Sequence, residues 1–368
     1  MKCCLRDIAV VSAGQGAPQG ASNYCKKGTP FVKAGNLQEL IEGKPIQDIQ
    51  QVSEEVAQKH RLKLYPKGTV LFAKSGMSCL KGYVYVLPCD SYVVSHLACI
   101  TPNDEISNYL QLFFTYHKPN QLVKDAAYPS ISLTDIGNLE IDIKSTDERQ
   151  QIVYKFERIK KIIALRKAEL QELDNLIKSR FVEMFGDPIT NSKRLSTLPM
   201  TDVCNIIDGD RGKNYPKQEE FEETGYCLFL NAKNVTTSGF NFDNCMFISK
   251  EKDELLRAGK LSRGDVVLTT RGTLGNLAFY TENIPYNNVR INSGMVILRM
   301  NRNIINEVFF IEQFKQQLSN IKAKIASGSA QPQLPISTMN KIQVVVGDIS
   351  KQNDFAKFVK QVDKSKVV

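Results

Sequence analysis

The stretch from Asp147 to Phe185 reads DERQQIVYKFERIKKIIALRKAELQELDNLIKSRFVEMF and contains no glycine or proline. Ordinary globular helices are shorter than this, so the stretch predicts a single long helix of roughly 58 Å at about 1.5 Å per residue. Apolar residues recur along it at alternating steps of four and three, interrupted only by Arg166: Ile152, Phe156, Ile159, Ile163, Leu170, Leu173 and Ile177. Such a narrow apolar seam predicts pairing with another helix.

Both ends of the predicted helix carry boundary signals. Ser145 and Glu148 have the S-x-x-E spacing of a capping box, and Gly186-Asp187-Pro188 supplies a left-handed stop and a breaker. Oppositely charged residues four apart, such as Glu157 and Lys161, favour a helix that is exposed on most of its circumference. We therefore interpret the helix as a spacer, with a long core helix of one large domain as the alternative.

Composition limits the class of protein. The chain has 368 residues, 42% of them hydrophobic and 24% charged, which is enough mass for two domains. No apolar run approaches the ~18 residues of a membrane span, and a cytoplasmic location is expected. Nine cysteines without a C-x-x-C motif are typical of reduced thiols. The net charge of +9 favours a polyanionic partner but does not separate nucleic acid from a generic basic surface.

The chain repeats itself. The offset between matching blocks grows only from 195 to 203 residues, and the order of the blocks is conserved. The matches are Asp7-Ile8 with Asp202-Val203, 31–37 with 229–235, 67–76 with 263–272, and 128–139 with 331–342. A period of this length is too long for a solenoid, so each copy should be a whole domain.

Each copy has the same expected anatomy: short strands, then a helix, a proline-containing loop and a final strand. The predicted strands are 69–73, 83–87 and 92–100 in copy one and 265–270, 277–281 and 295–300 in copy two, with helices over 106–124 and 305–325. The domain boundaries follow as 1–145 for the first domain, 146–187 for the spacer helix, 195–347 for the second domain and 348–368 for a shorter distal helix.

The distal helix carries the same seam. Phe355, Val359 and Val362 fall on Ile152, Phe156 and Ile159 at the offset of 203. We expect the two helices to pack together and to relate the two copies by a pseudo-twofold axis. Two diverged domains held at a fixed separation would read two different half-sites of a duplex, with the spacer acting as a ruler. The predicted target is a bipartite, asymmetric DNA sequence.

The order of these features resembles the specificity subunit of type I restriction-modification systems. The resemblance covers essentially the whole chain and rests on the duplicated F-x-x-A-x-N block, the basic-Gly hairpin, the proline loop and the long helix that ends RFVEMFGDP at 180–188. It implies an α+β fold with two tandem β-rich target-recognition domains, separated and followed by long coiled-coil-forming helices.

The resemblance also implies a role without catalysis. Each recognition domain would read one half of a split site in double-stranded DNA, and the helices would bind two modification subunits. Those partners would carry S-adenosylmethionine and methylate adenine, while restriction subunits would use ATP and Mg to translocate and cut DNA. No cofactor or metal is expected on this chain. The distal helix departs from the family pattern because it is roughly half the length of the central one, so a modification subunit, a second copy of the chain or further residues would have to cover part of the seam.

Candidate DNA contacts come from loops that differ between the copies. Arg and Lys suit guanine and phosphate, and Asn and Gln suit adenine. The candidates are Lys33, Asn36, Lys74, Ser75, Tyr128, Arg211, Lys213, Asn231, Lys233, Asn234, Arg271, Gln331 and Gln333. Asn36 and Asn234 have an alternative role in holding a turn, and the cationic residues have one as solvated surface charges. Gly209-Asp-Arg-Gly212 is better interpreted as a surface turn than as a phosphate cradle.

Two other classes of function remain open. A standalone bipartite DNA-binding regulator would also be basic, but it would not need a long seam to receive large partners. A nuclease would need an acidic cluster, and none is convincing here. The sequence has no G-x-x-x-x-G-K-[ST] or H-E-x-x-H motif. We interpret the three histidines, His60, His96 and His117, as packing or surface residues.

Overall fold

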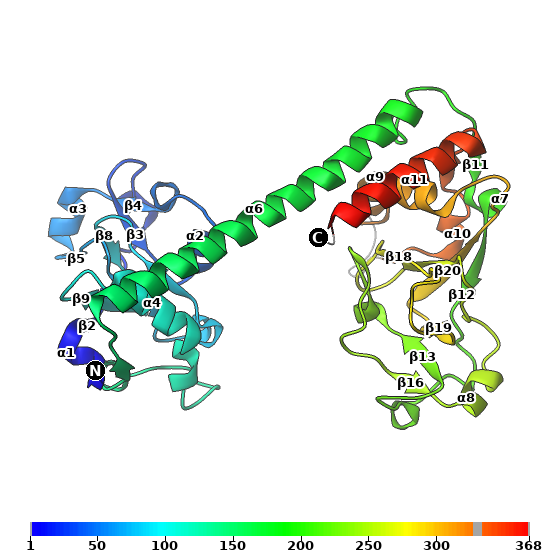
Figure 1. The fold of residues 1–368 in the computed structure, drawn as a ribbon. Helices are drawn as coiled ribbons and strands as arrows, with labels where there is room; N and C mark the ends of the chain where they lie inside the picture. Colours follow the sequence, from blue (N-terminus) through cyan, green and yellow to red (C-terminus); the bar gives the residue numbers. More distant parts are fainter. Residues whose placement is uncertain (1, 327–332, 367–368) are drawn as a thin grey trace. The chain divides into compact units, whose positions relative to one another are not determined.

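The computed structural model describes residues 2–326 and 333–366. The chain divides into two compact units, Met1–Leu165 and Arg166–Val368, and the boundary falls inside the long helix α6, Thr146–Phe185 (Figure 1).

Unit 1 contains two four-stranded sheets. The first has the order β2 (Ala9–Ala13), β9 (Leu97–Pro102), β6 (Val70–Ala73), β7 (Val84–Val86) and is antiparallel. The second has the order β4 (Gln51–Val52), β3 (Thr29–Val32), β8 (Ser91–Val93), β5 (Leu64–Tyr65), with β3 and β8 parallel. Strand β1 (Lys2–Cys4) pairs with β10 (Glu140–Asp142). The helices are α1 (Leu5–Ile8), α2 (Asn36–Ile41), α3 (Glu54–Lys59), α4 (Ser107–Tyr116) and α5 (Leu133–Gly137), with 3-10 turns η1 (Ala21–Asn23), η2 (Ile46–Asp48), η3 (Met77–Lys81) and η4 (Pro119–Leu122).

Unit 2 repeats this plan. Its first sheet has the order β12 (Cys204–Asp208), β20 (Met295–Met300), β17 (Val266–Thr269), β18 (Leu277–Phe279). Its second has the order β16 (Phe247–Ile248), β13 (Cys227–Leu230), β19 (Val289–Ile291), again with a parallel central pair. Two further pairs are β11 (Thr197–Pro199) with β21 (Gln343–Val345) and β14 (Val235–Thr236) with β15 (Gly239–Phe240). The helices are α7 (Met200–Val203), α8 (Lys250–Leu255), α9 (Glu307–Ala326), α10 (Ile336–Met339) and α11 (Ile349–Lys366), with 3-10 turns η5 (Gln218–Glu220) and η6 (Ala232–Asn234).

The shared strand order confirms the internal duplication predicted from the sequence. One close backbone approach recurs at the same place in both units. A Cβ on Gly14 would lie 2.2 Å from the carbonyl oxygen of Val93, and a Cβ on Gly209 would lie 2.3 Å from that of Asn292. Only glycine fits at either position, because the backbone just after β2 or β12 passes directly against the turn that joins the two sheets.

Two element boundaries in unit 1 differ from the prediction. The segment 92–100 is not one strand but two, β8 and β9, joined by a turn at Val94–His96 that carries the chain from one sheet to the other. The helix predicted over 106–124 ends at Tyr116, because Pro119 follows and its ring disfavours helical backbone at the preceding residue.

The ends of α6 agree with the sequence. The Ser145 hydroxyl and backbone N–H both donate to the Glu148 carboxylate, at 2.8 and 3.0 Å, and the Glu148 N–H donates back to the hydroxyl at 3.4 Å. Gly186 closes the helix with a φ of 80°. The predicted pairing of Glu157 with Lys161 is wrong in detail, since Glu157 pairs with Lys160 at 3.3 Å.

The part of α6 that belongs to unit 2 packs against α11, as the seam predicts. Ile177, Phe181 and Phe185 are buried in one cluster with Phe355 and with α9, and the Phe181 and Phe355 rings meet at 5.4 Å. Val359 and Val362 complete that cluster. The last two residues of the predicted seam, Leu173 and Ile177, thus join the core between these helices, to which Phe181 and Phe185 add.

The two helices run antiparallel. The start of α11 lies beside the end of α6, and at the opposite end the ammonium of Lys366 binds the Asp174 carboxylate at 2.7 Å. Arg166, the one interruption in the seam, donates to the carbonyl oxygens of Ser365 and Lys366 at 3.3 Å each. The guanidinium therefore satisfies carbonyls that have no partner within the last turn of α11.

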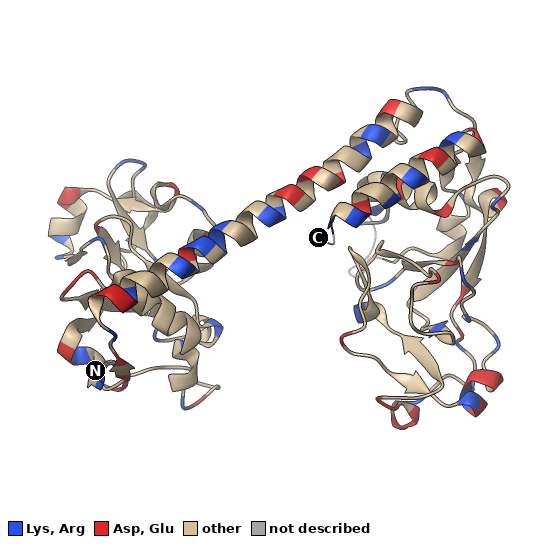
Figure 2. Cartoon of the chain, viewed as in Figure 1, with Lys and Arg blue, Asp and Glu red and all other residues tan. Residues whose placement is uncertain are grey.

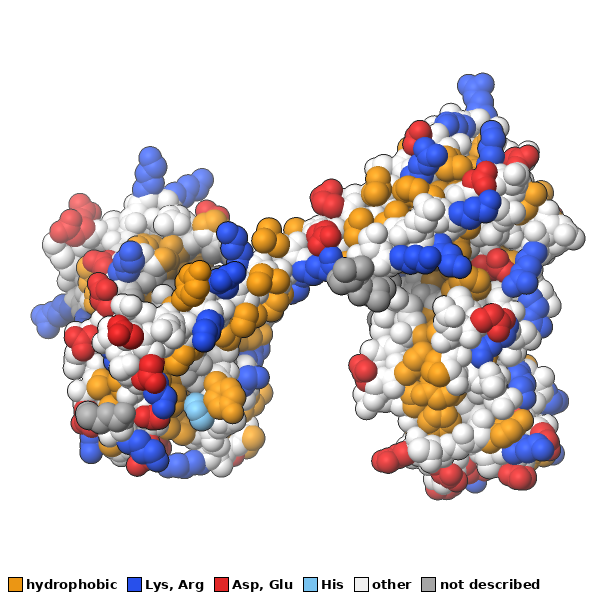
Figure 3. Space-filling model, viewed as in Figure 1, with side chains coloured by type: hydrophobic (Ala, Val, Ile, Leu, Met, Phe, Trp, Pro, Cys, Tyr) orange, Lys and Arg blue, Asp and Glu red, His pale blue; other side chains and the backbone are white. Residues whose placement is uncertain are grey.

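The part of α6 in unit 1 leaves its seam open. Ile152, Ile159 and Ile163 are 39%, 53% and 50% exposed, and Ile162 and Leu165 are exposed beside them. Figure 2 marks lysine and arginine positions along the same helix, and Figure 3 shows apolar side chains at its surface. We call the side chains of these five residues the open seam.

All nine cysteines are free thiols, as the sequence predicts. Burial raises the pKa of Cys99, Cys204 and Cys227 to about 12. Within residues 2–326 and 333–366, no helix is both long enough and apolar enough to span a lipid bilayer.

Candidate nucleic-acid interface

Strand ends from both sheets of unit 1 meet at one edge, which we call tip 1 and define as 13–15, 33–36, 74–76, 94–96 and 128–130. Backbone hydrogen bonds connect these segments. The Gln15 N–H donates to Val93 O at 2.8 Å, the Lys74 N–H to His96 O at 2.9 Å and the Gly76 N–H to Pro129 O at 3.0 Å. The hairpin and the proline loop, which are more than fifty residues apart in the sequence, are thus brought together.

Tip 1 contains five of the predicted residues, and three of them lie on the hairpin and the proline loop. Lys74 and Ser75 follow β6, and an isolated bridge joins Ser75 to Ser130, two residues after Tyr128. The Tyr128 side chain is 82% exposed. A cation, a hydroxyl and an aromatic ring therefore share this edge, which suits contact with phosphate and with base edges.

Lys33 and Asn36 lie at the end of β3. The Asn36 side-chain oxygen accepts the Lys33 N–H at 2.9 Å, so this residue holds the turn, one of the two roles that the sequence left open. The Lys33 ammonium donates to the Gln50 side chain at 2.6 Å and lies 4.4 Å from the centre of the Tyr24 ring. Both side chains are half-buried.

The corresponding edge of unit 2, tip 2, consists of 208–213, 231–234, 270–272, 292–294 and 333–334. The Asn292 N–H donates to Leu230 O at 3.1 Å, and the Leu334 N–H donates to Thr270 O at 3.1 Å. These contacts repeat the connections of tip 1 at equivalent positions.

Three predicted residues of tip 2 line one hollow of about 210 Å³: Arg211, Arg271 and Gln333. Arg211 donates to the Asp208 carboxylate at 3.0 Å and to Ser293 O at 3.3 Å, which holds its guanidinium in place. Arg271 is exposed, and its guanidinium makes no hydrogen bond or ion pair with the described residues. The hollow thus offers two guanidinium groups, one of them held by hydrogen bonds, together with an amide, and these are the groups that read guanine and adenine in a major groove.

Asn234 differs from its neighbours because it is 1% exposed. Its oxygen accepts the Asn231 N–H at 2.9 Å, and its amide nitrogen donates to Asn241 O and Asn244 O. Every polar atom of the side chain is used inside the fold, which is the turn role that the sequence offered as an alternative. Lys233 is exposed on the same turn, and Asn231 is half-buried with its oxygen accepting the Lys233 N–H.

The segment Gly209–Gly212 is an anchored turn. The Asp210 carboxylate is buried and accepts N–H groups from Gly212 at 2.8 Å and Arg257 at 2.7 Å. Burial alone would raise the pKa of Asp210, but these backbone donors outweigh it and lower the pKa. Because the carboxylate already uses the Gly212 N–H, this turn is not a phosphate cradle. Lys213 is exposed just beyond it, and Gln331 lies outside the described residues.

The protein-family model of the type I restriction modification DNA specificity domain matches residues 1–175 and again 195–367, which together are nearly the whole chain. The chain belongs to this specificity family. The two matches coincide with the two copies whose strand order and tips are equivalent.

Individual relatives agree with the specificity family. The specificity subunit of the type I restriction enzyme MjaIX from Methanocaldococcus jannaschii is 29% identical over 156 residues, which are 41% of this chain and 34% of the relative. The match thus spans about a third of that curated relative's length. Among solved structures, the type I restriction-modification S subunit from M. genitalium has a TM-score of 0.55 at 16% identity and covers 100% of this chain and 90% of its own. A chain from a study of complex assembly and conformational transition of the type I system has a TM-score of 0.57 at 15% identity, with the same coverage. At these identities the two structures show a shared fold.

Sequence reasoning missed one residue of tip 1 in this member of the specificity family. His96 is exposed on the turn between β8 and β9, and its Nδ1 lies 2.8 Å from the Ser75 hydroxyl oxygen. The signal that points to it is the alignment of Val94–His96 with Asn292–Gly294 in the second copy, whose Asn-Ser-Gly sequence marks the turn plainly.

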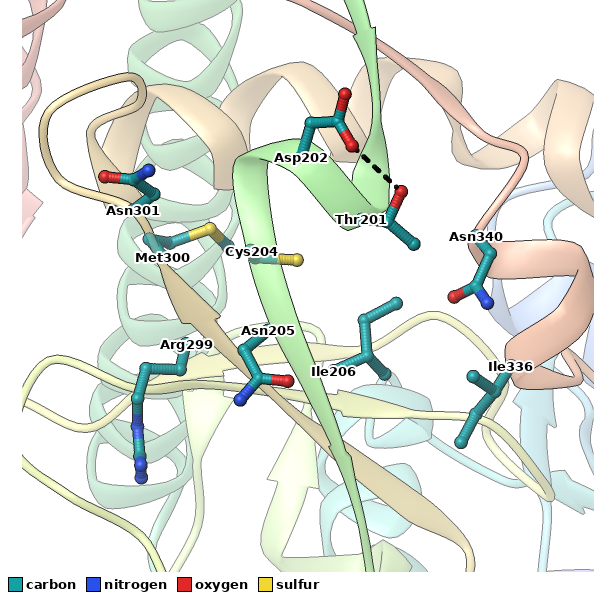
Figure 4. Close-up of a pocket in the computed structure, with 10 residues that line it drawn as sticks. All are labelled: Thr201, Asp202, Cys204, Asn205, Ile206, Arg299, Met300, Asn301, Ile336 and Asn340. Atoms are coloured by element: carbon teal, nitrogen blue, oxygen red, sulfur yellow. Dashed lines mark hydrogen bonds between the residues drawn. The ribbon is translucent and has the colours of Figure 1, made fainter.

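Grooves elsewhere in the two units are lined by none of the residues that the sequence predicts to contact DNA. One of about 540 Å³ lies along the start of β12, where Figure 4 shows residues of β12, β20 and α10 around a polar hollow. An equivalent groove of about 430 Å³ follows β2 in unit 1. The guanidinium in the unit 2 groove, that of Arg299, already binds Asp265 at 2.8 Å, and Asp202 adds a carboxylate. This chemistry is a poor match to a phosphate backbone.

Proposed function

We propose that this chain is the DNA sequence-recognition subunit of a type I restriction-modification complex. In this proposal each unit reads one half of a bipartite, asymmetric site in double-stranded DNA. The observation that carries the proposal is the pair of equivalent tips with unlike side chains. Because the two tips lie at equivalent places in their units, we expect both to dock on DNA in the same way. Because their side chains differ, we expect them to read different half-sites.

The tips supply the contacts. At tip 2, Arg211, Arg271 and Gln333 are the proposed base readers, with Lys213 and Lys233 placed for phosphate. At tip 1, Lys74, Ser75 and Tyr128 face the duplex, and the Lys33 ammonium adds positive charge. Asn36, Asn231 and Asn234 shape the turns on which these residues stand. Gln331, which lies outside the described residues, is proposed as a further DNA contact.

The helices are proposed to act as ruler and as docking surface. The antiparallel packing of α6 with α11 supports a coiled-coil core, and we propose that the pseudo-twofold arrangement of the two domains follows from it. The open seam is an apolar strip without a partner among the described residues, and we propose that a modification subunit covers it. Such contiguous exposed apolar surface marks protein interfaces.

This chain is proposed to be non-catalytic and to hold no cofactor. The chemistry would come from two modification subunits that carry S-adenosylmethionine and methylate adenine, and from restriction subunits that use ATP and Mg. These partners and the DNA substrate locate the function in the cytoplasm. A standalone regulator is the runner-up, but it leaves the open seam without an explanation.

Selection of duplexes from a randomised library by the full chain tests the proposal. We expect two conserved half-sites separated by an unread gap of fixed length. A single continuous motif would contradict two-domain reading, and the absence of any enriched motif would contradict sequence recognition itself.

A further inference from the structure

Tip 1 carries a hydrogen-bonded pair of side chains, Ser75 and His96, whereas tip 2 carries arginines. We propose that His96, held by Ser75, reads a base edge in the half-site of unit 1. This inference rests on the proposed function and adds a specificity-determining residue to it.

The geometry fixes the imidazole ring. Its Nδ1 is bound by the Ser75 hydroxyl at 2.8 Å, and the backbone oxygen of His96 accepts the Lys74 N–H at 2.9 Å. From the other side, the Ser95 N–H donates to Gln15 O at 2.8 Å and anchors the turn. The ring therefore loses little conformational freedom when it binds, which favours affinity and selectivity.

The hydrogen bond also leaves the second ring nitrogen free. Among the described residues only Nδ1 is engaged, and His96 is exposed, so Nε2 is available to a ligand. When the Ser75 hydroxyl donates to Nδ1, the ring proton lies on Nε2 and points outward. An outward N–H donor matches the N7 and O6 acceptors of guanine in the major groove.

The second copy has no equivalent of the Ser75–His96 pair, so the proposed contact belongs to one half-site. The residues equivalent to Ser75 and His96 are Arg271 and Gly294, so tip 2 has no imidazole at this place and instead carries a guanidinium that makes no hydrogen bond or ion pair with the described residues. The same scaffold thus presents an imidazole held by a hydroxyl in one unit and an arginine in the other, so different side chains would read the two half-sites at this position.

The test compares the sequence preference of the full chain before and after His96→Ala, with a randomised duplex library as the probe. We expect the preference for guanine at one position of one half-site to fall about ten-fold, or about 1.4 kcal/mol, with the other half-site unchanged. Ser75→Ala should weaken the preference at that same position. Replacing this guanine with 7-deazaguanine should reduce wild-type binding and leave the His96→Ala protein unaffected.

His117→Ala is the matched control, because His117 is also exposed in unit 1 but stacks on Phe113, with ring centres 4.7 Å apart. It should keep the wild-type motif. If wild-type protein selects a bipartite motif and His96→Ala selects the same one, the role of His96 is refuted and the proposed function stands. If the affected base is cytosine, whose major-groove edge offers only a donor, Nε2 acts as an acceptor and the donor assignment is refuted; if it is adenine or thymine, the assignment to guanine is refuted. If wild-type protein selects no motif, both the proposed function and this inference fail.

Discussion

Replacing Phe355 with alanine tests the helix pairing of unit 2 at its centre. The side chain is fully buried, with its ring 5.4 Å from that of Phe181 and 5.9 Å from that of Phe185. Phe→Ala changes at such sites cost about 3–5 kcal/mol, because transfer free energy is lost and a cavity remains. For a unit of this size, about 2–4 °C per kcal/mol gives a fall in melting temperature of about 6–20 °C.

Ile159→Ala is the matched change on the open seam. Ile159 occupies the same seam but is 53% exposed, so its truncation should alter the free energy of unfolding by about 0.5 kcal/mol or less. Urea denaturation gives the free energy, and hydrogen exchange read on α11 peptides locates the change in unit 2. A cost below about 1 kcal/mol for Phe355→Ala, or an equal cost for both variants, would refute the assignment of the seam to helix pairing.

Four further results are expected. The Asp253 carboxylate is buried, but Lys260 and Arg290 lower its pKa despite that burial, so unit 2 should be stabilised above about pH 4 and should lose that stability as the pH falls through the lowered pKa. Asp253→Asn should lower the urea midpoint at pH 7 and flatten its dependence between pH 4 and 2; an unchanged dependence would exclude this ion pair as the cause. Ile159→Asp with Ile163→Asp should abolish copurification with modification subunits while leaving the urea midpoint intact, and Lys155→Asp, on exposed helix outside the seam, should not; retained copurification would place the docking surface elsewhere. Exchange of segment 195–347 for that of a relative should change one half-site only, and a change in both would refute separate reading. Four residues inserted between Arg158 and Ile159 should lengthen the tolerated gap by about two base pairs, since they add about 6 Å of helix; an unaltered gap would refute the ruler.

The features predictable from sequence are those with a local or repeated signature. The period of the seam defines α6 to within one residue, and four colinear blocks define two copies with equal strand order. Arg166 shows the limit of such reasoning. It interrupts the apolar seam, and its guanidinium binds carbonyl oxygens at the C-terminal end of α11, about two hundred residues away in the sequence. This role depends on a tertiary contact, so the sequence pattern of α6 alone could not predict it.

His96 was missed for a similar physical reason. Tyr92–Ile100 is apolar and β-branched on both sides of Ser95 and His96, so it reads as one buried strand, and the turn lacks the glycine or asparagine that marks its counterpart. Asn234, in contrast, is a candidate DNA contact in the sequence because an amide side chain can bind adenine. In the structure its amide nitrogen donates to the carbonyl oxygens of Asn241 and Asn244, and no local sequence pattern predicts these two contacts.

The most direct test of the central claim is single-molecule methylome sequencing of cells that express this chain with and without its modification partners. We predict methyladenine in both halves of one split, asymmetric motif, appearing only when the chain and the partners are present together. Methylation that is independent of this chain, or confined to one uninterrupted motif, would contradict the account.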